Sequence, residues 1–256
     1  MQRTIDFNCD MGESFGAWRM GDDEGVMPWI TSANIACGFH AGDSATMAAT
    51  VALAHTHGVA IGAHVGLPDL AGFGRREMEI DAAQAYAYTL HQLGALSAFA
   101  IAAGTRVRHF KAHGALYHMV AREAALAVAT VRAIRDFDAR LLVYGPALSA
   151  LAAACAQARI AFVAEGFADR RYGADGRLVP RPQAGAVIER VEDAVAQALT
   201  LIDPTRERGT DDSSALRIDT LCLHGDRNGA AQFARALREA LEAAQIKVVA
   251  PGDAFA

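Results

Sequence analysis

The chain has 256 residues, of which 52% are hydrophobic and 21% charged, and 24 basic against 29 acidic residues give a formal net charge of −5. This much apolar material excludes intrinsic disorder, and the acidic balance argues against a nucleic-acid-binding protein, which usually carries a basic patch. The four cysteines, Cys9, Cys37, Cys155 and Cys222, form no CxxC pair. The sequence therefore predicts neither a zinc ribbon nor a disulfide framework, and it suits a reducing cytoplasm.

One stretch of the chain is long enough to cross a membrane. Residues 82–105 carry no charge, and about 20 apolar residues make a span. The stretch also contains Gln84, His91 and Gln92, and the pair Asp81 and Gln84 is close to a capping box. We therefore expect a buried helix here, and the beginning of the chain shows no apolar targeting segment.

Short β-type runs alternate with longer, alanine-rich helical runs along the chain. The predicted strands are residues 4–8, 33–36, 59–63, 107–110, 141–144, 160–164, 220–223 and 247–249. The predicted helices are residues 44–57, 82–103, 122–135, 147–158, 189–202 and 229–244, with a short one near 22–29. This alternation indicates βαβ units and a parallel sheet. We predict an α/β protein with one domain over residues 1–256: a TIM-like (β/α) barrel that is either regular or irregular and seven-stranded.

A doubly wound open sheet is the rival architecture. Its G-x-G-x-x-G fingerprint is missing after the first strand, where residues 8–13 read NCDMGE, and a Walker A motif is absent everywhere. The chain thus shows no recognisable ATP site of its own. Two long loops interrupt the alternation: residues 166–186 are expected to cover a site, and the polar residues 203–217 are expected to be flexible.

Polar and ionisable residues gather where the predicted strands end. They are Asn8, Asp10 and Glu13 after the first strand, His40 and Asp43 after the second, His64 after the third, Lys111 and His113 after the fourth, and His224 and Asp226 after the seventh. The carboxyl ends of parallel strands meet on one rim, where such folds form active sites. Because four histidines follow four strands, each with a glycine nearby, a functional rim is favoured over isolated structural residues.

The spacing of these residues does not decide what chemistry the rim performs. Its carboxylates and histidines could bind a divalent metal that activates water, or they could act as acid–base groups without one. No H-E-x-x-H motif decides between them. Lys111 would attract an anionic substrate or stabilise an oxyanion.

Other ionisable residues are weaker candidates. Arg75, Arg170 and Arg181 lie in loops and could hold a carboxylate, although a surface loop or a structural ion pair explains them equally well. Four further histidines lie on predicted helices or inside a strand and are expected to be structural: His55, His57, His91 and His109.

Several motifs together resemble the LamB/YcsF family. They are NCDMGESFG (8–16), SANIACGFHAGD (32–43), GAH (62–64), GFGRR (72–76), KAHGALY (111–117), EGFADR (165–170), LVPR (178–181) and HGD (224–226). They cover nearly the whole chain in order, so the resemblance is specific. It implies a (β/α) barrel related to the glycoside hydrolase/deacetylase group. It also implies the reaction of prokaryotic 5-oxoprolinase, in which 5-oxo-L-proline, ATP and water give L-glutamate, ADP and phosphate.

The family is the A subunit of that enzyme, and the resemblance implies B and C partner subunits that handle the ATP-dependent activation. The missing Walker motif agrees with this division. The sequence departs from the family pattern at Val65, Leu67, Ala112, His118 and Arg227. These departures spare the ionisable residues and alter the pocket wall, so they bear on substrate preference.

The resemblance and the rim together give an expected site. The expected catalytic set is Asp10, Glu13, His40, His64, Lys111, His113 and Asp226. The expected substrate-binding set is Asn8, Asp43, Arg75, Arg170, Arg181 and His224. In this hypothesis Asp10 or Glu13 is the general base, and the histidines position or transfer protons. Lys111 stabilises an oxyanion or phosphate, and Asp226 orients a histidine or joins a metal site.

Two other functions remain open on the sequence. A stand-alone metal-dependent amidohydrolase or deacetylase would use the same rim on another small amide, with bound metal and no need for ATP. A non-catalytic partner subunit would keep its activity-supporting role when rim residues are replaced.

Overall fold

The computed structural model describes residues 3–173, 176–181, 183–203, 218–226 and 229–253 of the chain. Its strands are β1 (Thr4–Met11), β2 (Ser32–Ala36), β3 (Ala60–Val65), β4 (Val107–Ala112), β5 (Leu142–Gly145), β6 (Phe162–Phe167), β7 (Thr220–Leu223) and β8 (Lys247–Val248). Its helices are α1 (Asp23–Val26), α2 (Ser44–Thr56), α3 (Ala82–Ala102), α4 (Gly114–Arg122), α5 (Ala124–Asp138), α6 (Ala150–Ala158), α7 (Val191–Ile202) and α9 (Ala230–Ala243), with the short turns η1 (Met27–Trp29) and η2 (Pro251–Asp253).

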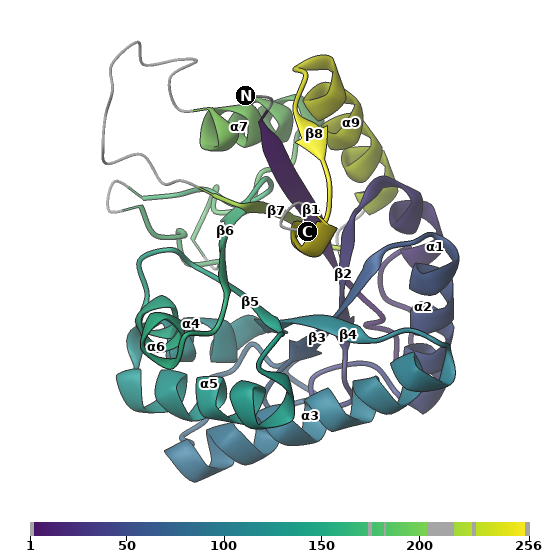
Figure 1. Ribbon diagram of the computed structural model, residues 1–256. Helices are drawn as coiled ribbons and strands as arrows, with labels where there is room; N and C mark the ends of the chain where they lie inside the picture. Colours follow the sequence, from purple (N-terminus) through teal and green to yellow (C-terminus); the bar gives the residue numbers. More distant parts are fainter. Residues whose placement is uncertain (1–2, 174–175, 182, 204–217, 227–228, 254–256) are drawn as a thin grey trace.

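The strands β1 to β7 form a closed parallel barrel. Neighbours follow chain order from β2 to β7, β7 pairs with β1, and β1 pairs with β2 to complete the ring. The strand β8 pairs with Thr4 and Ile5 at the start of β1, ahead of the residues that pair with β7 and β2. Figure 1 shows the helices around the outside of this ring. The predicted irregular (β/α) barrel is confirmed, and the open doubly wound sheet is wrong.

The helix α3 is the uncharged stretch that was long enough for a membrane span. Asp81 and Gln84 form the capping box that the sequence suggested. Thr89, Gln92, Leu93 and other side chains of this helix are buried against the barrel. No helix in the part of the chain that the structure describes combines the length and apolar character that a membrane span needs.

Several strands run further than their apolar residues suggested. The strands β1, β3, β4 and β6 continue to Met11, Val65, Ala112 and Phe167, and their last residues still pair with neighbours, as in Asp10↔Asn34 and His64↔Lys111. Polar residues near these ends appeared to be loop because they interrupt the apolar run. They are ladder residues whose side chains face the inside of the barrel. The helix α4 was not predicted, because it follows His113 directly and has no side-chain cap to signal its start.

Alternation along β1 explains why the inside of the barrel is polar. Successive side chains of a strand point to opposite faces. The odd positions from Ile5 to Met11 are apolar and belong to the core between strands and helices, while Asp6, Asn8 and Asp10 are buried on the other face. The barrel is thus filled by polar side chains where branched aliphatic residues are usual. Nearly all such buried groups need hydrogen-bond partners.

At the amino end of the strands, Asp6 organises the lower layer of the barrel. Its carboxylate accepts hydrogen bonds from the hydroxyls of Thr31 (2.6 Å), Ser32 (2.8 Å), Tyr144 (3.0 Å) and Thr220 (2.6 Å). Burial raises the pKa of Asp6, and these four hydrogen bonds lower it again in part. The hydrogen-bonding capacity of the buried Asp6 carboxylate is thus met by side chains of the protein itself.

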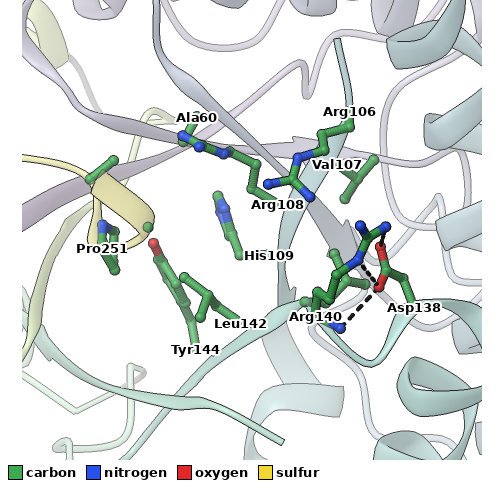
Figure 2. Close-up of a pocket in the computed structure, with 13 residues that line it drawn as sticks. Ala60, Arg106, Val107, Arg108, His109, Asp138, Arg140, Leu142, Tyr144 and Pro251 are labelled. Carbon is green, nitrogen blue, oxygen red and sulfur yellow. Dashed lines mark hydrogen bonds and ion pairs between the residues drawn. The ribbon is translucent and has the colours of Figure 1, made fainter. Parts of the chain in front are cut away.

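A small pocket of about 100 Å³ opens at this same end of the barrel (Figure 2). Among its lining residues are His109, Tyr144 and Pro251 of η2. The His109 ring stacks on Tyr144 with centroids 4.3 Å apart, and its Nε2 lies 2.8 Å from Asn34 Oδ1. These contacts agree with the structural role expected for His109.

Candidate active site

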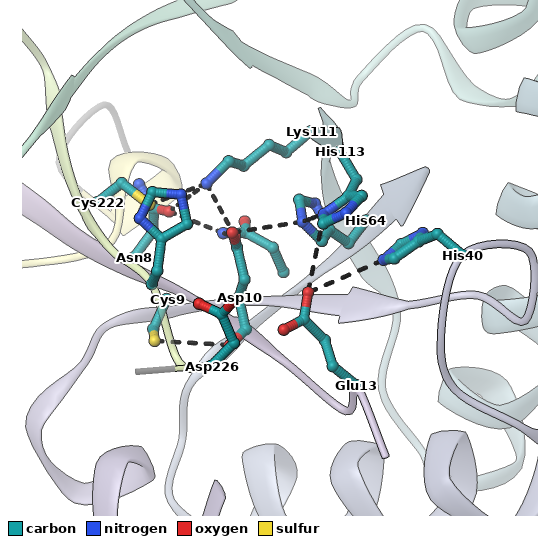
Figure 3. Close-up of polar contacts among 12 residues, drawn as sticks. Asn8, Cys9, Asp10, Glu13, His40, His64, Lys111, His113, Cys222 and Asp226 are labelled. Carbon is teal, nitrogen blue, oxygen red and sulfur yellow. Dashed lines mark hydrogen bonds and ion pairs between the residues drawn. The ribbon is translucent and has the colours of Figure 1, made fainter. Parts of the chain in front are cut away.

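Lys111 of β4 lies inside the barrel, further towards the carboxyl ends of the strands than Asp6, with Asn8, Asp10 and Cys222 around it (Figure 3). Its Nζ donates to Asp10 Oδ1 at 2.8 Å, Glu165 Oε1 at 2.9 Å and Asn8 Oδ1 at 3.2 Å, and lies 3.0 Å from Cys222 Sγ. Burial alone would lower the pKa of Lys111, but Asp10, Cys222 and Glu165 outweigh it and hold that pKa well above its usual value. The lysine is therefore charged and already surrounded by acceptors.

Asp10 links this lysine to the histidines. Asn34 Nδ2 donates to its Oδ1 at 2.9 Å, and His64 Nε2 lies 3.4 Å from its Oδ2. Burial would raise the pKa of Asp10, but His64 and Lys111 hold it well below its usual range. Asp10 is thus a buried, ionised carboxylate fixed in direction by its neighbours.

Three histidines and a glutamate form a second group beside Asp10, called here the imidazole cluster: Glu13, His40, His64 and His113. They follow or belong to the carboxyl ends of β1 to β4, and all four are buried. The rings of His40 and His113 stack in parallel, with centroids 3.8 Å apart and an interplanar angle of 6°. His113 Nδ1 lies 2.9 Å from His64 Nε2. Figure 3 shows these side chains converging from different elements.

Two glycines make the stack of rings possible. A Cβ on Gly66 would lie 2.2 Å from His40 Nδ1. A Cβ on Gly74, whose φ is +61°, would lie 2.7 Å from His40 Cβ and 2.9 Å from His113 Cδ2. Backbone and ring approach so closely here that only glycine fits. Gly66 is one of the glycines that the sequence places just after a strand-end histidine, whereas Gly74 belongs to the GFGRR run.

Within the imidazole cluster, the pKa shifts of two histidines and of the glutamate go in opposite directions. Burial lowers the pKa of His40 and of His113 well below the usual value, and neighbouring imidazoles lower it further. Burial also raises the pKa of Glu13 well above its usual value, with Asp10 and Asp226 adding to the rise. The two histidines are therefore neutral, so each has one ring nitrogen that carries a lone pair.

An open pocket of about 500 Å³ lies over Asp10, His64, Lys111 and His113. Its outer wall contains three arginines from two loops: Arg75, Arg170 and Arg181. Leu178 and Pro180 also line it, so the long loop after β6 covers the site, as its composition predicted. The other long loop falls on residues 204–217, which lie outside the described residues.

The three arginines are not equivalent. Asp226 accepts from Arg75 NH2 at 2.6 Å and lies 3.5 Å from Arg181 NH1. Arg170 is only 5% exposed and donates one hydrogen bond through its NH2 to the Val179 carbonyl, at 2.8 Å. Its Nε has no partner among the described residues. Burial and the charges of Arg181 and Arg75 lower the pKa of Arg170.

Two expected site residues, Asp43 and Asp226, contact other groups than the hypothesis assigned to them. Asp43 caps α2 by accepting from Thr46 N at 2.8 Å and also accepts from Gly16 N at 2.8 Å, so it is engaged in holding the loop. Asp226 pairs with arginines, whereas Asp169 is the carboxylate that holds His224, at 3.0 Å from its Nδ1. The remaining expected residues do gather around the pocket or directly beneath it.

Sequence reasoning missed several residues that shape this site. Glu165 is a buried partner of Lys111, and Tyr117, Phe167 and Cys222 surround the same pocket floor. Glu165 lies in the EGFADR run and Tyr117 in the KAHGALY run, so both lay within motifs that resembled the family. Inward alternation along β6 would have selected Glu165.

A closed barrel with an ionisable pocket at the carboxyl ends of its strands is the architecture of an α/β-barrel enzyme. The chain belongs to the LamB/YcsF family, whose model matches residues 5–255. The resemblance seen in the motifs is thereby confirmed.

Known relatives match over nearly their whole length. The A subunit of 5-oxoprolinase from Bordetella pertussis is 54% identical over 243 residues, which cover 94% of this chain and 96% of that protein. The A subunit of 5-oxoprolinase from Methylococcus capsulatus is 53% identical over 253 residues, covering 98% and 97%. The crystal structure of a lactam utilization protein from Thermus thermophilus superposes with a TM-score of 0.87 at 41% identity, covering 96% of this chain and 99% of that one.

Proposed function

We propose that this chain is the A subunit of an ATP-dependent 5-oxoprolinase, which opens the lactam ring of 5-oxo-L-proline to give L-glutamate. The observation that carries the proposal is the near-complete match to proteins named as this subunit. The pocket supports it, because acid–base groups form its floor and arginines form its outer wall. ATP is the co-substrate, and B and C subunits are the partners. The four free, buried cysteines suit the proposed cytoplasmic location.

Arg170 is the group best suited to hold the substrate carboxylate. A guanidinium binds a carboxylate through two parallel charge-assisted hydrogen bonds. Arg75 and Arg181 already share Asp226, whereas the Nε of Arg170 has no partner among the described residues. Arg170 is also well buried, and screening by water is weaker there. The carboxylate of 5-oxoproline would then place the ring over the pocket floor.

The lactam must be activated before water can open it, because a five-membered lactam is a stable amide. Phosphorylation of the carbonyl oxygen by ATP creates a leaving group and an electrophilic carbon. The chain has no Walker A motif, so we assign this step to the complex with the B and C subunits. Attack by one water on that carbon and departure of the ring nitrogen then leave an acyl phosphate of glutamate. A second water releases the phosphate from it and gives glutamate.

Asp10 is our candidate for directing the attacking water. It lines the pocket and remains ionised beside Lys111. An ionised carboxylate of low pKa is a weak base, but a phosphorylated carbonyl needs an oriented water more than a strong base. The donors of Lys111 already face Asp10, Glu165 and Asn8. We therefore propose that Lys111 fixes the charge and direction of Asp10 and does not itself reach the oxyanion.

The test is glutamate release from 5-oxoproline by the purified chain, alone and with its B and C partners, each with and without ATP. We expect glutamate only when partners and ATP are both present, and a large loss with Asp10→Asn. Turnover by the chain alone without ATP would favour a metal-dependent amidohydrolase. Full activity of Asp10→Asn in the complex would favour a non-catalytic partner subunit.

A further inference from the structure

The imidazole cluster has the composition and geometry of a metal site. We propose that Glu13, His40, His64 and His113 bind one divalent transition-metal ion of the zinc type at the inner wall of the pocket. Binding of the ion stands on the geometry of the cluster alone, and only its use in lactam opening rests on the proposed function. Each residue offers one ligand atom, and these atoms all lie within 4.8 Å of one another.

The separations within the cluster fit bonds to a single ion. Zinc–nitrogen and zinc–oxygen bonds of about 2.0–2.2 Å put neighbouring ligand atoms of a tetrahedron roughly 3.3–3.6 Å apart. His113 Nδ1 lies 2.9 Å from His64 Nε2 and 3.7 Å from Glu13 Oε1, and His40 Nε2 lies 3.9 Å from the same oxygen. These distances bracket the expected value. The two contacts to Glu13 are too long for hydrogen bonds.

His40 supplies the second, independent observation. It is 0% exposed, and neither of its ring nitrogens has a hydrogen-bond partner among the described residues. Buried polar groups are nearly always paired. His109 is the internal reference, since it is also buried in the barrel and is satisfied by Asn34. A buried imidazole that the protein leaves unpaired points to a ligand.

His113 is held in the tautomer that metal binding through Nδ1 requires. Its Nε2 lies 2.8 Å from the carbonyl oxygen of Phe73. Because a carbonyl only accepts, the proton is on Nε2 and the lone pair of Nδ1 faces the cluster. Metal-binding histidines typically donate their second ring N–H to a backbone carbonyl or carboxylate in this way.

A chain of hydrogen bonds explains less of the geometry than an ion does. A proton on His64 Nε2 would account for its contact with His113 but would leave His40 and the long contacts of Glu13 unexplained. Three imidazoles and one carboxylate favour zinc, cobalt, iron or nickel over magnesium or calcium. An ion here would supply Lewis-acid stabilisation of negative charge developing at the pocket floor.

The test measures metal binding by the full chain alone, without lactam, ATP or partner subunits. The protein is stripped with a chelator and then titrated with Zn²⁺ and Co²⁺, followed by calorimetry, elemental analysis and the visible absorption of bound Co²⁺. We expect one equivalent of either ion and no competition from Mg²⁺. In His40→Ala and Glu13→Gln, binding should weaken at least about a hundredfold, since each removes a direct ligand.

Matched variants separate ligation from folding. His109→Gln changes a buried histidine outside the cluster and His57→Ala an exposed one, and both should keep wild-type binding. His40→Gln, with its fold checked by circular dichroism, replaces His40→Ala if the latter does not fold. A wild-type chain that shows neither calorimetric binding nor a Co²⁺ spectrum overturns the proposal, as does unchanged affinity in a folded His40 variant. Because no turnover is measured, failure of the oxoprolinase assignment would leave this result intact.

Discussion

Asp6 and His40 lie near opposite ends of the same barrel, and their surroundings are opposite in kind. Both side chains are buried, so both lose their hydration on folding. Four hydroxyl groups compensate Asp6. No described residue makes a hydrogen bond to either nitrogen of His40. The layer around Asp6 satisfies its own polar groups, whereas the layer of the imidazole cluster leaves His40 without a hydrogen-bond partner among the described residues. Stability and chemistry should therefore respond separately to substitutions in the two layers.

The largest effect is expected at Lys111, which neutralises the carboxylates between the two layers. Lys111→Met leaves the buried Asp10 and Glu165 without their cation. Removing one partner of such a buried group typically costs about 3–5 kcal/mol. Urea unfolding should show this loss, and glutamate release by the complex should fall with it. Lys247→Met, at an exposed lysine on β8, should stay within about 0.5 kcal/mol of the wild type. Equal stability of the two variants would contradict the role given to Lys111.

The contrast between Asp6 and His40 predicts opposite responses to substitution. Asp6→Ala removes the acceptor of four hydroxyls and should destabilise the chain by about 2–4 kcal/mol. The folded variant should keep kcat within about threefold in the complex, because Asp6 lies away from the pocket.

His40→Ala should do the reverse. It removes no protein hydrogen bond in the described structure. A cavity of this kind costs roughly 2–5 kcal/mol, but removing an unpaired buried polar group returns roughly 1–3 kcal/mol, so the metal-free chain should lose about 1–2 kcal/mol. Glutamate release should fall by at least about a hundredfold, or ~2.7 kcal/mol in the barrier. Chemical denaturation and initial rates on both variants measure the two responses. If both variants lost stability and activity in parallel, the division into two layers would be wrong.

The sequence predicted the barrel better than it predicted the contacts within it. Alternating strands and helices specify a parallel barrel, and strand-end histidines indicated the rim, because these depend on local periodicity. The partners of Lys111 did not follow in the same way. Glu165 comes from a strand two places along the barrel, and a contact across the barrel depends on closure and register, which the sequence pattern leaves open. The N-cap role of Asp43 was missed for the opposite reason. An aspartate just before a helix is a local capping signal, but Asp43 also ends the SANIACGFHAGD motif and was therefore assigned to the site.

A smaller effect, confined to substrate binding, is expected at Arg170. Arg170→Met keeps much of the side-chain volume but removes the proposed anchor for the substrate carboxylate. The KM for 5-oxoproline should rise about 10- to 100-fold, which corresponds to roughly 1.4–2.7 kcal/mol, while kcat changes less than about threefold. Arg170→Lys should restore little, because an ammonium lacks the planar pair of donors. Arg171→Met, next in sequence and exposed, is the control and should leave KM unchanged. A fall in kcat at constant KM would instead place Arg170 away from the carboxylate.

The smallest effect is expected where the pocket wall meets solvent, at Asp226. The ionisable groups around it are Arg75 from the loop after β3, Arg181 from the loop after β6, His224 just after β7, and Glu13 after β1. Burial alone would raise the pKa of Asp226, but Arg75, His224 and Arg181 hold it below the usual value.

A carboxyl whose pKa is lower in the folded than in the unfolded chain contributes stability above its unfolded pKa and loses it as the pH falls. Asp226→Asn should thus cost at most about 1 kcal/mol above pH ~5, because Arg75 is 35% exposed and water screens the pair. The difference from wild type should shrink towards zero as the pH is lowered through ~4 to ~3. Urea unfolding across this range measures it, with the exposed Asp193→Asn as control. A difference that grew as the pH fell would mean that Asp226 is held in its protonated form, and the arginines on the pocket wall would then be free to bind anions.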